Sequence, residues 1–162
     1  MGTEIERKFL TAQDSWRHEA CGTPYSQGYI SRRNGHTVRI RIAGEEAFLT
    51  IKGPVIGISR AEFEYAIPTA DARQLMTFCE GPFIEKTRFK IFDSGHLWEI
   101  DEFHGANAGL VLAEVELSHP DEKVLMPRWI GKEVTGDPRY YNSNLTLHPY
   151  QEWDENRVCT KH

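Results

Sequence analysis

The sequence lacks long hydrophobic runs and has few cysteines. Among its 162 residues no apolar stretch approaches the roughly 20 residues that a membrane-spanning helix needs. The charged N-terminal segment also lacks the apolar core of a signal peptide. The three cysteines are odd in number and far apart, so they indicate neither a disulfide framework nor a structural zinc site. We therefore expect a cytoplasmic protein with no membrane partner, whose hydrophobic core needs no metal or disulfide to fold.

Several motifs that mark common enzyme classes are absent as well. There is no Gly-x-x-x-x-Gly-Lys-Ser/Thr loop and no Gly-rich strand-to-helix turn, which argues against P-loop and Rossmann nucleotide sites. A Gly-x-Ser-x-Gly elbow is missing, and the histidines form no metalloprotease pair. The formal net charge of −5 argues against nonspecific binding of nucleic acid by the surface as a whole, so we expect no nucleic-acid partner. A local basic pocket is still allowed.

The main pattern in the sequence is an alternation of polar and apolar residues. Because neighbouring side chains of a strand point to opposite faces, this alternation predicts strands with one apolar face. The links between the segments are short, which favours antiparallel pairing. With no repeat or linker in the sequence, we predict a single domain over residues 1–162 of class α+β, mostly antiparallel β. The predicted strands are residues 3–10, 27–31, 37–42, 48–52, 60–67, 84–91, 97–103 and 110–117.

Helices are predicted only between and after these strands. A short helix is expected near 15–20, with a chain break at 22–24, and a longer one over 70–79 that Thr69 can cap. Beyond the last strand we predict a short helix over 120–126, an irregular link over 127–131 and a helix over 139–147. The polar C-terminal tail, residues 148–162, gives no clear prediction.

The polar face of the predicted strands is almost entirely charged. A face that is merely solvated usually mixes Ser, Thr, Gln and Asn among its charges, and long stretches here do not. The bases on this face are Lys8, Arg39, Arg41, Lys52, Arg60, Lys86, Arg88 and Lys90. The acids are Glu4, Glu6, Glu62, Glu64, Glu99, Asp101, Glu114 and Glu116.

A sheet of eight strands tends to curl or to close into a barrel. If its apolar face turns outward under the helices, the charged face lines a polar interior, whether the barrel is closed or incompletely closed. Such a lining is costly unless it binds ions. Bases suit a polyanion, and carboxylates suit divalent metals that prefer oxygen ligands. The charged face therefore predicts a metal-dependent phosphate site.

The motifs on these strands resemble those of the CYTH, or triphosphate tunnel metalloenzyme, superfamily. Its signature Glu-x-Glu-x-Lys matches Glu4, Glu6 and Lys8. The resemblance continues, in order, to about residue 147. The further matching motifs are Gln27-Gly28-Tyr29, Arg39-x-Arg41, Thr50-Ile51-Lys52-Gly53, Arg60-x-Glu62-x-Glu64, Lys86-Thr87-Arg88, Glu99-x-Asp101, Glu114-x-Glu116, Glu133-Val134-Thr135 and Arg139-Tyr140.

The resemblance implies an eight-stranded antiparallel barrel or tunnel that acts on triphosphates with Mg²⁺ or Mn²⁺. The sequence looks most like the short bacterial inorganic triphosphatases, which split tripolyphosphate into pyrophosphate and phosphate. A thiamine or nucleoside triphosphatase, a class IV adenylate cyclase, and a non-catalytic polyphosphate-binding module are the alternatives. Uncompensated acidic pairs argue against the last, since anion binding alone gains nothing from them. Oligomeric state is left open, and a homodimer is compatible with the small size.

The resemblance also implies roles for single residues. Arginine gives bidentate contacts to phosphate and lysine a point charge. The expected phosphate ligands are Lys8, Arg39, Arg41, Lys52, Arg60, Lys86 and Arg88. The expected metal ligands are Glu4, Glu6, Glu114 and Glu116. A second metal site or a supporting role for the cations is expected of Glu62, Glu64 and Asp101.

Tyr29 and Lys52 are the predicted catalytic pair, again by resemblance. A neighbouring ammonium lowers the pKa of a phenol from its ordinary value of about 10, which would make Tyr29 a base that works best at alkaline pH. The alternative is a metal-bound water activated by Glu114 or Glu116, with Tyr29 as a packed aromatic at the rim. The sequence does not decide between the two.

Overall fold

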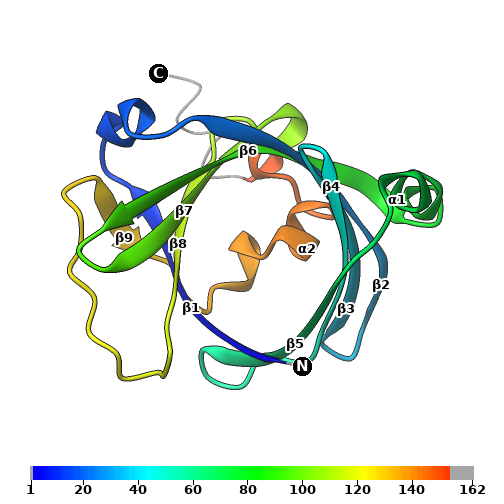
Figure 1. Ribbon diagram of the computed structural model, residues 1–162, viewed down its shortest axis with the longest axis horizontal. Coiled ribbons are helices and arrows are strands. Elements are labelled where there is room, and N and C mark those ends of the chain that lie inside the picture. The colour runs from blue at the N-terminus through cyan, green and yellow to red at the C-terminus, as the bar shows by residue number, and fades with distance from the viewer. Residues whose placement is uncertain (1, 154–162) are drawn as a thin grey trace.

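The computed structural model describes residues 2–153 as a closed antiparallel barrel of eight strands, β1 to β8, with β9 paired outside the ring (Figure 1). Around the ring the order is β1-β5-β4-β3-β2-β6-β7-β8, and β8 returns to β1. The predicted antiparallel class is confirmed, and the barrel is closed. The strands are β1 (Gly2–Thr11), β2 (Gly22–Arg33), β3 (His36–Ala43), β4 (Glu46–Lys52), β5 (Ser59–Ala66), β6 (Glu80–Asp93), β7 (His96–Phe103), β8 (Val111–Glu116) and β9 (Ile130–Glu133).

The strand register brings charges of neighbouring strands side by side. Lys8 on β1 lies opposite Glu114 on β8. Arg88 on β6 lies opposite Asp101 on β7. Because side chains alternate with a period of two, a slip by one residue would move a whole row to the other face. The register therefore fixes which charges meet inside the barrel.

Two of the three hydrophobic clusters found in residues 2–153 lie outside the ring, as the alternation predicts. Trp16 and Trp98 are fully buried, and the ring centroid of Trp98 lies 5.6 Å from that of Trp129. The 3-10 helix η1 (Ser15–His18) carries Trp16 onto this cluster. The helix α1 (Thr69–Met76) packs its buried Ala72 and Met76 against β3 and β4. No helix among residues 2–153 is long and apolar enough to cross a membrane.

The C-terminal segment fills part of the interior, and we call residues 134–153 the plug. It contains η3 (Pro138–Tyr140), α2 (Asn142–Leu145) and η4 (Tyr150–Glu152). Leu145 and Tyr140 pack in one buried cluster with Ile84 near the start of β6, Phe103 at the end of β7 and Leu112 at the start of β8. These strand ends lie at the same end of the barrel, because neighbouring strands run in opposite directions. Figure 1 shows α2 within the outline of the ring. Unlike α1, α2 therefore does not pack on the outer face.

The start of β2 differs from the prediction. A chain break was expected at 22–24, but these residues continue β2 and pair with β6, with Gly22 opposite Phe89. A Cβ atom at Gly22 would lie 2.4 Å from Cγ2 of Thr87, so only glycine allows the strand to pass at this point. Gly22, which resembled a chain break in the sequence, is the point at which β2 and β6 pass close to each other.

Four further predictions around the helices were wrong. Residues 120–126 form no helix. Instead the carboxylate of Glu122 accepts the backbone N–H of Ser118 at 2.7 Å and holds that loop. Residues 127–131 contain the start of β9, whose short ladder with β1 is irregular. The helix expected over 139–147 is broken at Tyr141, whose backbone is extended. Thr69 is not the cap of α1, because Pro68 occupies that position.

Leu145 provides a test of the plug. Its side chain is fully buried in the cluster with Ile84 and Phe103, so Leu145→Ala should leave a cavity and lower the free energy of unfolding by about 2–5 kcal/mol. Denaturant unfolding followed by circular dichroism measures this. Leu147→Ala, at a side chain that is 55% exposed, is the control and should change stability little. Equal effects of the two substitutions would contradict the placement of the plug.

Candidate functional site

The predicted site residues meet in one cavity of about 300 Å³ inside the barrel. Every predicted phosphate ligand and metal ligand lines it, as do Tyr29, Glu62 and Glu64. Asp101 is the exception, because it is fully buried behind the lining. The plug contributes Thr135 and Asn142 to the same cavity. The interior is thus a single site built from strands that are far apart in the sequence.

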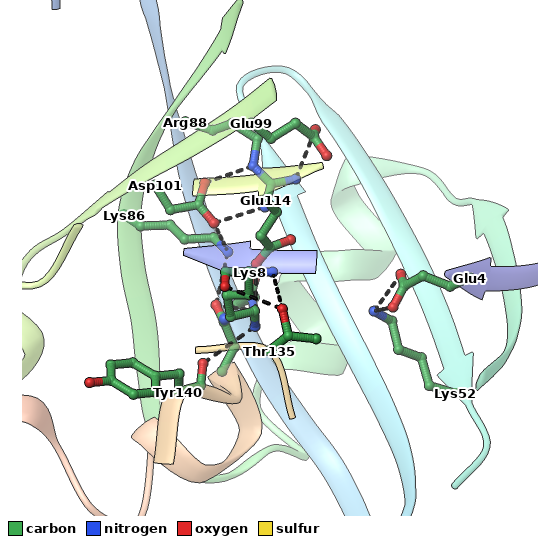
Figure 2. Close-up of polar contacts among 12 residues, drawn as sticks. Glu4, Lys8, Lys52, Lys86, Arg88, Glu99, Asp101, Glu114, Thr135 and Tyr140 are labelled. Carbon is green, nitrogen blue, oxygen red and sulfur yellow. Dashed lines mark hydrogen bonds and ion pairs between the residues drawn. The ribbon is translucent and has the colours of Figure 1, made fainter. Parts of the chain in front are cut away.

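Asp101 joins two of the cations. Its Oδ2 accepts hydrogen bonds of 2.8 Å from Nζ of Lys86 and from Nη2 of Arg88, and its Oδ1 accepts one of 2.7 Å from Nε of Arg88 (Figure 2). Burial alone would raise the pKa of Asp101, but Arg88 and Lys86 hold it far below its ordinary range. With both oxygens occupied, Asp101 is placed to hold the two cations, which matches the supporting role left open above.

Lys86 and Lys8 are both buried, but their surroundings differ. Nζ of Lys86 donates to Asp101 and, at 2.8 Å, to Oδ1 of Asn142 from the plug. Burial lowers the pKa of Lys86 to about 7, although Asp101 opposes this shift. Nζ of Lys8 lies 3.4 Å from Glu114, and although burial opposes it, this carboxylate raises the pKa of Lys8. The pKa of Lys8 is thus raised and that of Lys86 lowered, although each ammonium has a carboxylate partner.

Arg41 leaves positive charge unneutralised on β3, whereas Nη2 of Arg39 lies 3.5 Å from the carboxylate of Glu64. Nη2 of Arg39 donates to Oγ1 of Thr50 at 3.1 Å, and its buried Nε has no partner within residues 2–153. Nε of Arg41 donates to Oε1 of Gln27 at 2.8 Å, and no ion pair of Arg41 is found in this part of the chain. Burial and the charges of Arg39 and Arg88 lower the pKa of Arg41 to about 9. A bound anion would relieve this repulsion. We call Arg39, Arg41, Lys86 and Arg88 the cationic wall.

The carboxylates of β1, β5 and β8 form the opposite side, and we define this acidic wall as Glu4, Glu6, Glu62, Glu114 and Glu116. Glu6 makes no hydrogen bond or ion pair within the described chain. Burial, together with the neighbouring Glu114 and Glu4, raises its pKa to about 8. Burial and Glu4 likewise raise the pKa of Glu62 to about 7. These carboxylates repel one another, and a cation would relieve that repulsion.

The acidic wall suits a hard divalent cation whose remaining ligands come from water and from a bound phosphate. No group of three or more His, Cys, Asp or Glu side chains within residues 2–153 is arranged to hold a metal by itself. Mg²⁺ is commonly bound through only one or two carboxylates, with water and substrate phosphates as the other ligands. Glu6, whose carboxylate has no protein partner in this range, is the most available ligand, with Glu114 and Glu116 beside it.

Tyr29 and Lys52 line the same cavity but are not in direct contact in the described structure. Nζ of Lys52 donates to both oxygens of Glu4, at 2.8 and 3.0 Å (Figure 2). The hydroxyl of Tyr29 accepts a hydrogen bond of 3.1 Å from Nε2 of Gln27. The guanidinium of Arg60 donates to backbone oxygens of Gly53 and Gly35, so it also stabilises the neighbouring loops.

Several lining residues were not predicted. Tyr25 points inward on β2, and the sequence carried a usable signal, since it has the same parity as Tyr29; the expected break at 22–24 concealed it. Gln27 was noted in a motif, but its contacts with Arg41 and Asn142 were not foreseen. Asn142 and Thr135 belong to the plug, where no periodic pattern points into the barrel.

Comparison with known proteins identifies the family. The model of the CYTH domain family matches residues 2–141. The chain belongs to the CYTH domain family. This match covers all the strands of the barrel and extends into the plug, so the cavity described above is the interior of the CYTH domain.

Two relatives of this CYTH domain are named inorganic triphosphatase. The one from Acetivibrio thermocellus is 49% identical over 158 residues, which cover 96% of this chain and 100% of the relative. The one from Nitrosomonas europaea is 40% identical over 152 residues, which cover 90% of this chain and 97% of the relative.

Solved structures agree in fold. The crystal structure of an inorganic triphosphatase superposes with a TM-score of 0.64 at 37% identity, covering 91% of this chain and 96% of that one. A Hippeastrum protein described as having a dominant triphosphatase activity superposes with a TM-score of 0.58, covering 72% of this chain and 80% of that one. Its identity is 14%, so this second likeness concerns the fold alone.

Glu6 makes the stability of the protein depend on pH. Its pKa in the folded protein, about 8, lies above the ordinary value of about 4.3. The folded state therefore retains a proton that the unfolded chain releases, and stability falls as the pH rises from about 4.3 to 8. Without added metal, Glu6→Gln should unfold at a higher temperature than the parent at pH 8 and at the same temperature at pH 4.

Thermal unfolding in a chelating buffer measures this difference. Glu19→Gln removes an exposed carboxylate and is the control, for which we expect no pH-dependent gain. A gain for Glu6→Gln that is equal at pH 4 and pH 8 would contradict the explanation.

Proposed function

We propose that the protein hydrolyses inorganic triphosphate to pyrophosphate and phosphate with the help of a divalent metal ion. The observation that carries this proposal is the polarity of the cavity, with a cationic wall on β3 and β6 facing an acidic wall on β1, β5 and β8. One ligand that satisfies both walls is a polyanion that brings a metal ion. The two relatives named inorganic triphosphatase, which align over nearly the whole chain, support the substrate.

The cationic wall supplies the phosphate ligands. Arg39 and Arg41 can contact oxygens of one phosphate group bidentately, while Lys86 acts as a point charge. The transition state of phosphoryl transfer spreads negative charge over the transferred group and the leaving group, and preorganised cations stabilise that charge. Asp101 keeps Lys86 and Arg88 in place, so little reorganisation is needed when substrate binds.

The acidic wall would hold Mg²⁺ or Mn²⁺ through Glu6, Glu114 and Glu116, with Glu4 alongside. When bound, the metal neutralises charge on the phosphate oxygens and helps to orient them. Lys52, a proposed phosphate ligand, forms ion pairs with Glu4 and Glu62 of the acidic wall. A second metal at Glu62 and Glu64 stays a prediction, as do the homodimer and the cytoplasmic location.

In the proposed step the oxygen of a water molecule forms a bond to a terminal phosphorus, and the bond from that phosphorus to the bridging oxygen breaks. Pyrophosphate leaves with the electron pair, and the cations stabilise its charge. The proton of the water passes to a base. Tyr29 is one candidate for this base, and a carboxylate of the acidic wall, Glu114 or Glu116, is the other.

A panel of substrates tests the proposal. Tripolyphosphate, thiamine triphosphate and ATP are incubated with Mg²⁺, and phosphate, pyrophosphate and cyclic AMP are measured. We expect the highest kcat/KM for tripolyphosphate, because no element beyond the phosphate ligands is identified for an organic group. Preference for an organic triphosphate, formation of cyclic AMP, or binding without product would each overturn the proposed activity in favour of an alternative named above.

Lys52→Ala and Glu4→Ala test the location of the site. The two side chains form an ion pair in the lining of the cavity, and each substitution should lower kcat for tripolyphosphate at least about 100-fold while circular dichroism stays unchanged. Lys123→Ala, at an exposed side chain outside the barrel, is the control. Full activity of both cavity variants would mean that the reaction takes place elsewhere.

Tyr29→Phe distinguishes the two candidate bases. We expect the loss of the hydroxyl to lower kcat about 100-fold, because a base that takes the proton of the attacking water contributes at least about that much. The pH profile of kcat measures this, and Tyr65→Phe at an exposed tyrosine is the control. Undiminished turnover at every pH would assign the base to the carboxylates.

A further inference from the structure

Tyr25 lies between two arginines of the cationic wall. The centre of its ring is 5.0 Å from Cζ of Arg41 and 4.9 Å from Cζ of Arg88, and each guanidinium lies over the ring. Tyr25 is on β2, which pairs with β3 on one side and with β6 on the other. Because Arg41 belongs to β3 and Arg88 to β6, the two guanidinium groups reach the ring from opposite neighbours.

The two arginines differ in what else holds them. Arg88 is fixed by hydrogen bonds of 2.7 and 2.8 Å to Asp101 and by one of 3.1 Å to Glu99. Arg41 has one hydrogen bond to Gln27 and no ion pair within residues 2–153. The ring of Tyr25 is therefore a larger share of what orients Arg41 than of what orients Arg88.

An aromatic ring suits this position for a physical reason. Two like charges in a partly desolvated cavity repel each other, and a carboxylate placed between them would compete with phosphate for both. The face of an aromatic ring attracts a cation, more strongly when water is excluded, without adding a negative charge. The ring is 8% exposed, and it can hold both guanidinium groups while leaving their remaining N–H groups for a ligand.

We propose that Tyr25 is a positioning residue whose ring orients the guanidinium of Arg41, next to Arg88, toward the phosphate groups of the substrate. The inference rests on the proposed function for the identity of that substrate. Tyr25 acts through Arg41 and does not itself take part in the reaction. Its hydroxyl makes no hydrogen bond in the described structure, so the ring alone carries the role.

The test compares Tyr25→Phe with Tyr25→Leu, which keep and remove the ring. For Tyr25→Leu we expect KM for tripolyphosphate to rise about tenfold with a smaller change in kcat, whereas Tyr25→Phe stays within about twofold of the parent. Phe92→Leu is the control, because it also removes a ring from a strand of the barrel, but Phe92 on β6 is 79% exposed and does not line the cavity. If Tyr25→Leu does not fold, Tyr25→Met gives the same comparison.

A double-mutant cycle with Arg41→Met separates positioning from a general loss of packing. If the ring acts through Arg41, its loss should matter much less once Arg41 is gone, so the two effects on tripolyphosphate affinity should be far from additive. Additive effects, an unchanged KM for Tyr25→Leu, or equal damage from Tyr25→Phe would overturn the proposal. The affinity for tripolyphosphate is also measured by calorimetry. If the protein binds tripolyphosphate without hydrolysing it, the proposed reaction is refuted, but the affinities of the variants still test the role of Tyr25.

Discussion

The structure depends on one constraint, namely that charges turned into a closed barrel must find partners there. Moving an ion out of water costs several kcal/mol even after relaxation, and only good geometry offsets that cost. The contacts of Asp101 with Lys86 and Arg88 meet this requirement, with three hydrogen bonds of 2.7–2.8 Å. Because charge lines the cavity, most of the apolar core lies outside the strands, under η1 and α1, with fully buried tryptophans. Apolar side chains fill the interior only where the plug packs into one end of the barrel.

The pairing inside the barrel is incomplete in a consistent way. Arg41 on β3 and Glu6 on β1 have no ion pair within the described chain, and in the ring order β3 and β1 are separated by β4 and β5 on one side. The two groups therefore cannot neutralise each other directly. A protein that gained stability from its interior alone would pair them or replace them with apolar side chains. Their separation is instead suited to a ligand that presents an anion to one wall and a cation to the other.

Period-two alternation was enough to locate the eight strands of the ring and to choose their inner face, so nearly every predicted ligand does line the cavity. What failed has a local cause in each case. Gly22 was predicted to break the chain because the sequence around it does not show that Thr87 of the neighbouring strand comes so close. The plug has no regular period, so Asn142 could not be placed near Lys86. The alternation assigned Asp101 to the inner face, but only the register could show that it lies behind the lining.

The ring is closed by the strand that is made first. β1 pairs with β5 through Gly2 to Ile5, with β8 through Glu6 to Leu10, and with β9 beyond the barrel. During synthesis this strand must therefore wait for more than half of the chain before it finds its last neighbours. Contacts that join such distant segments form slowly, since loop closure precedes any gain from them. The alternating charges of β1 then have a second consequence, because they keep an unpaired early strand hydrated and discourage its association with other unfinished chains.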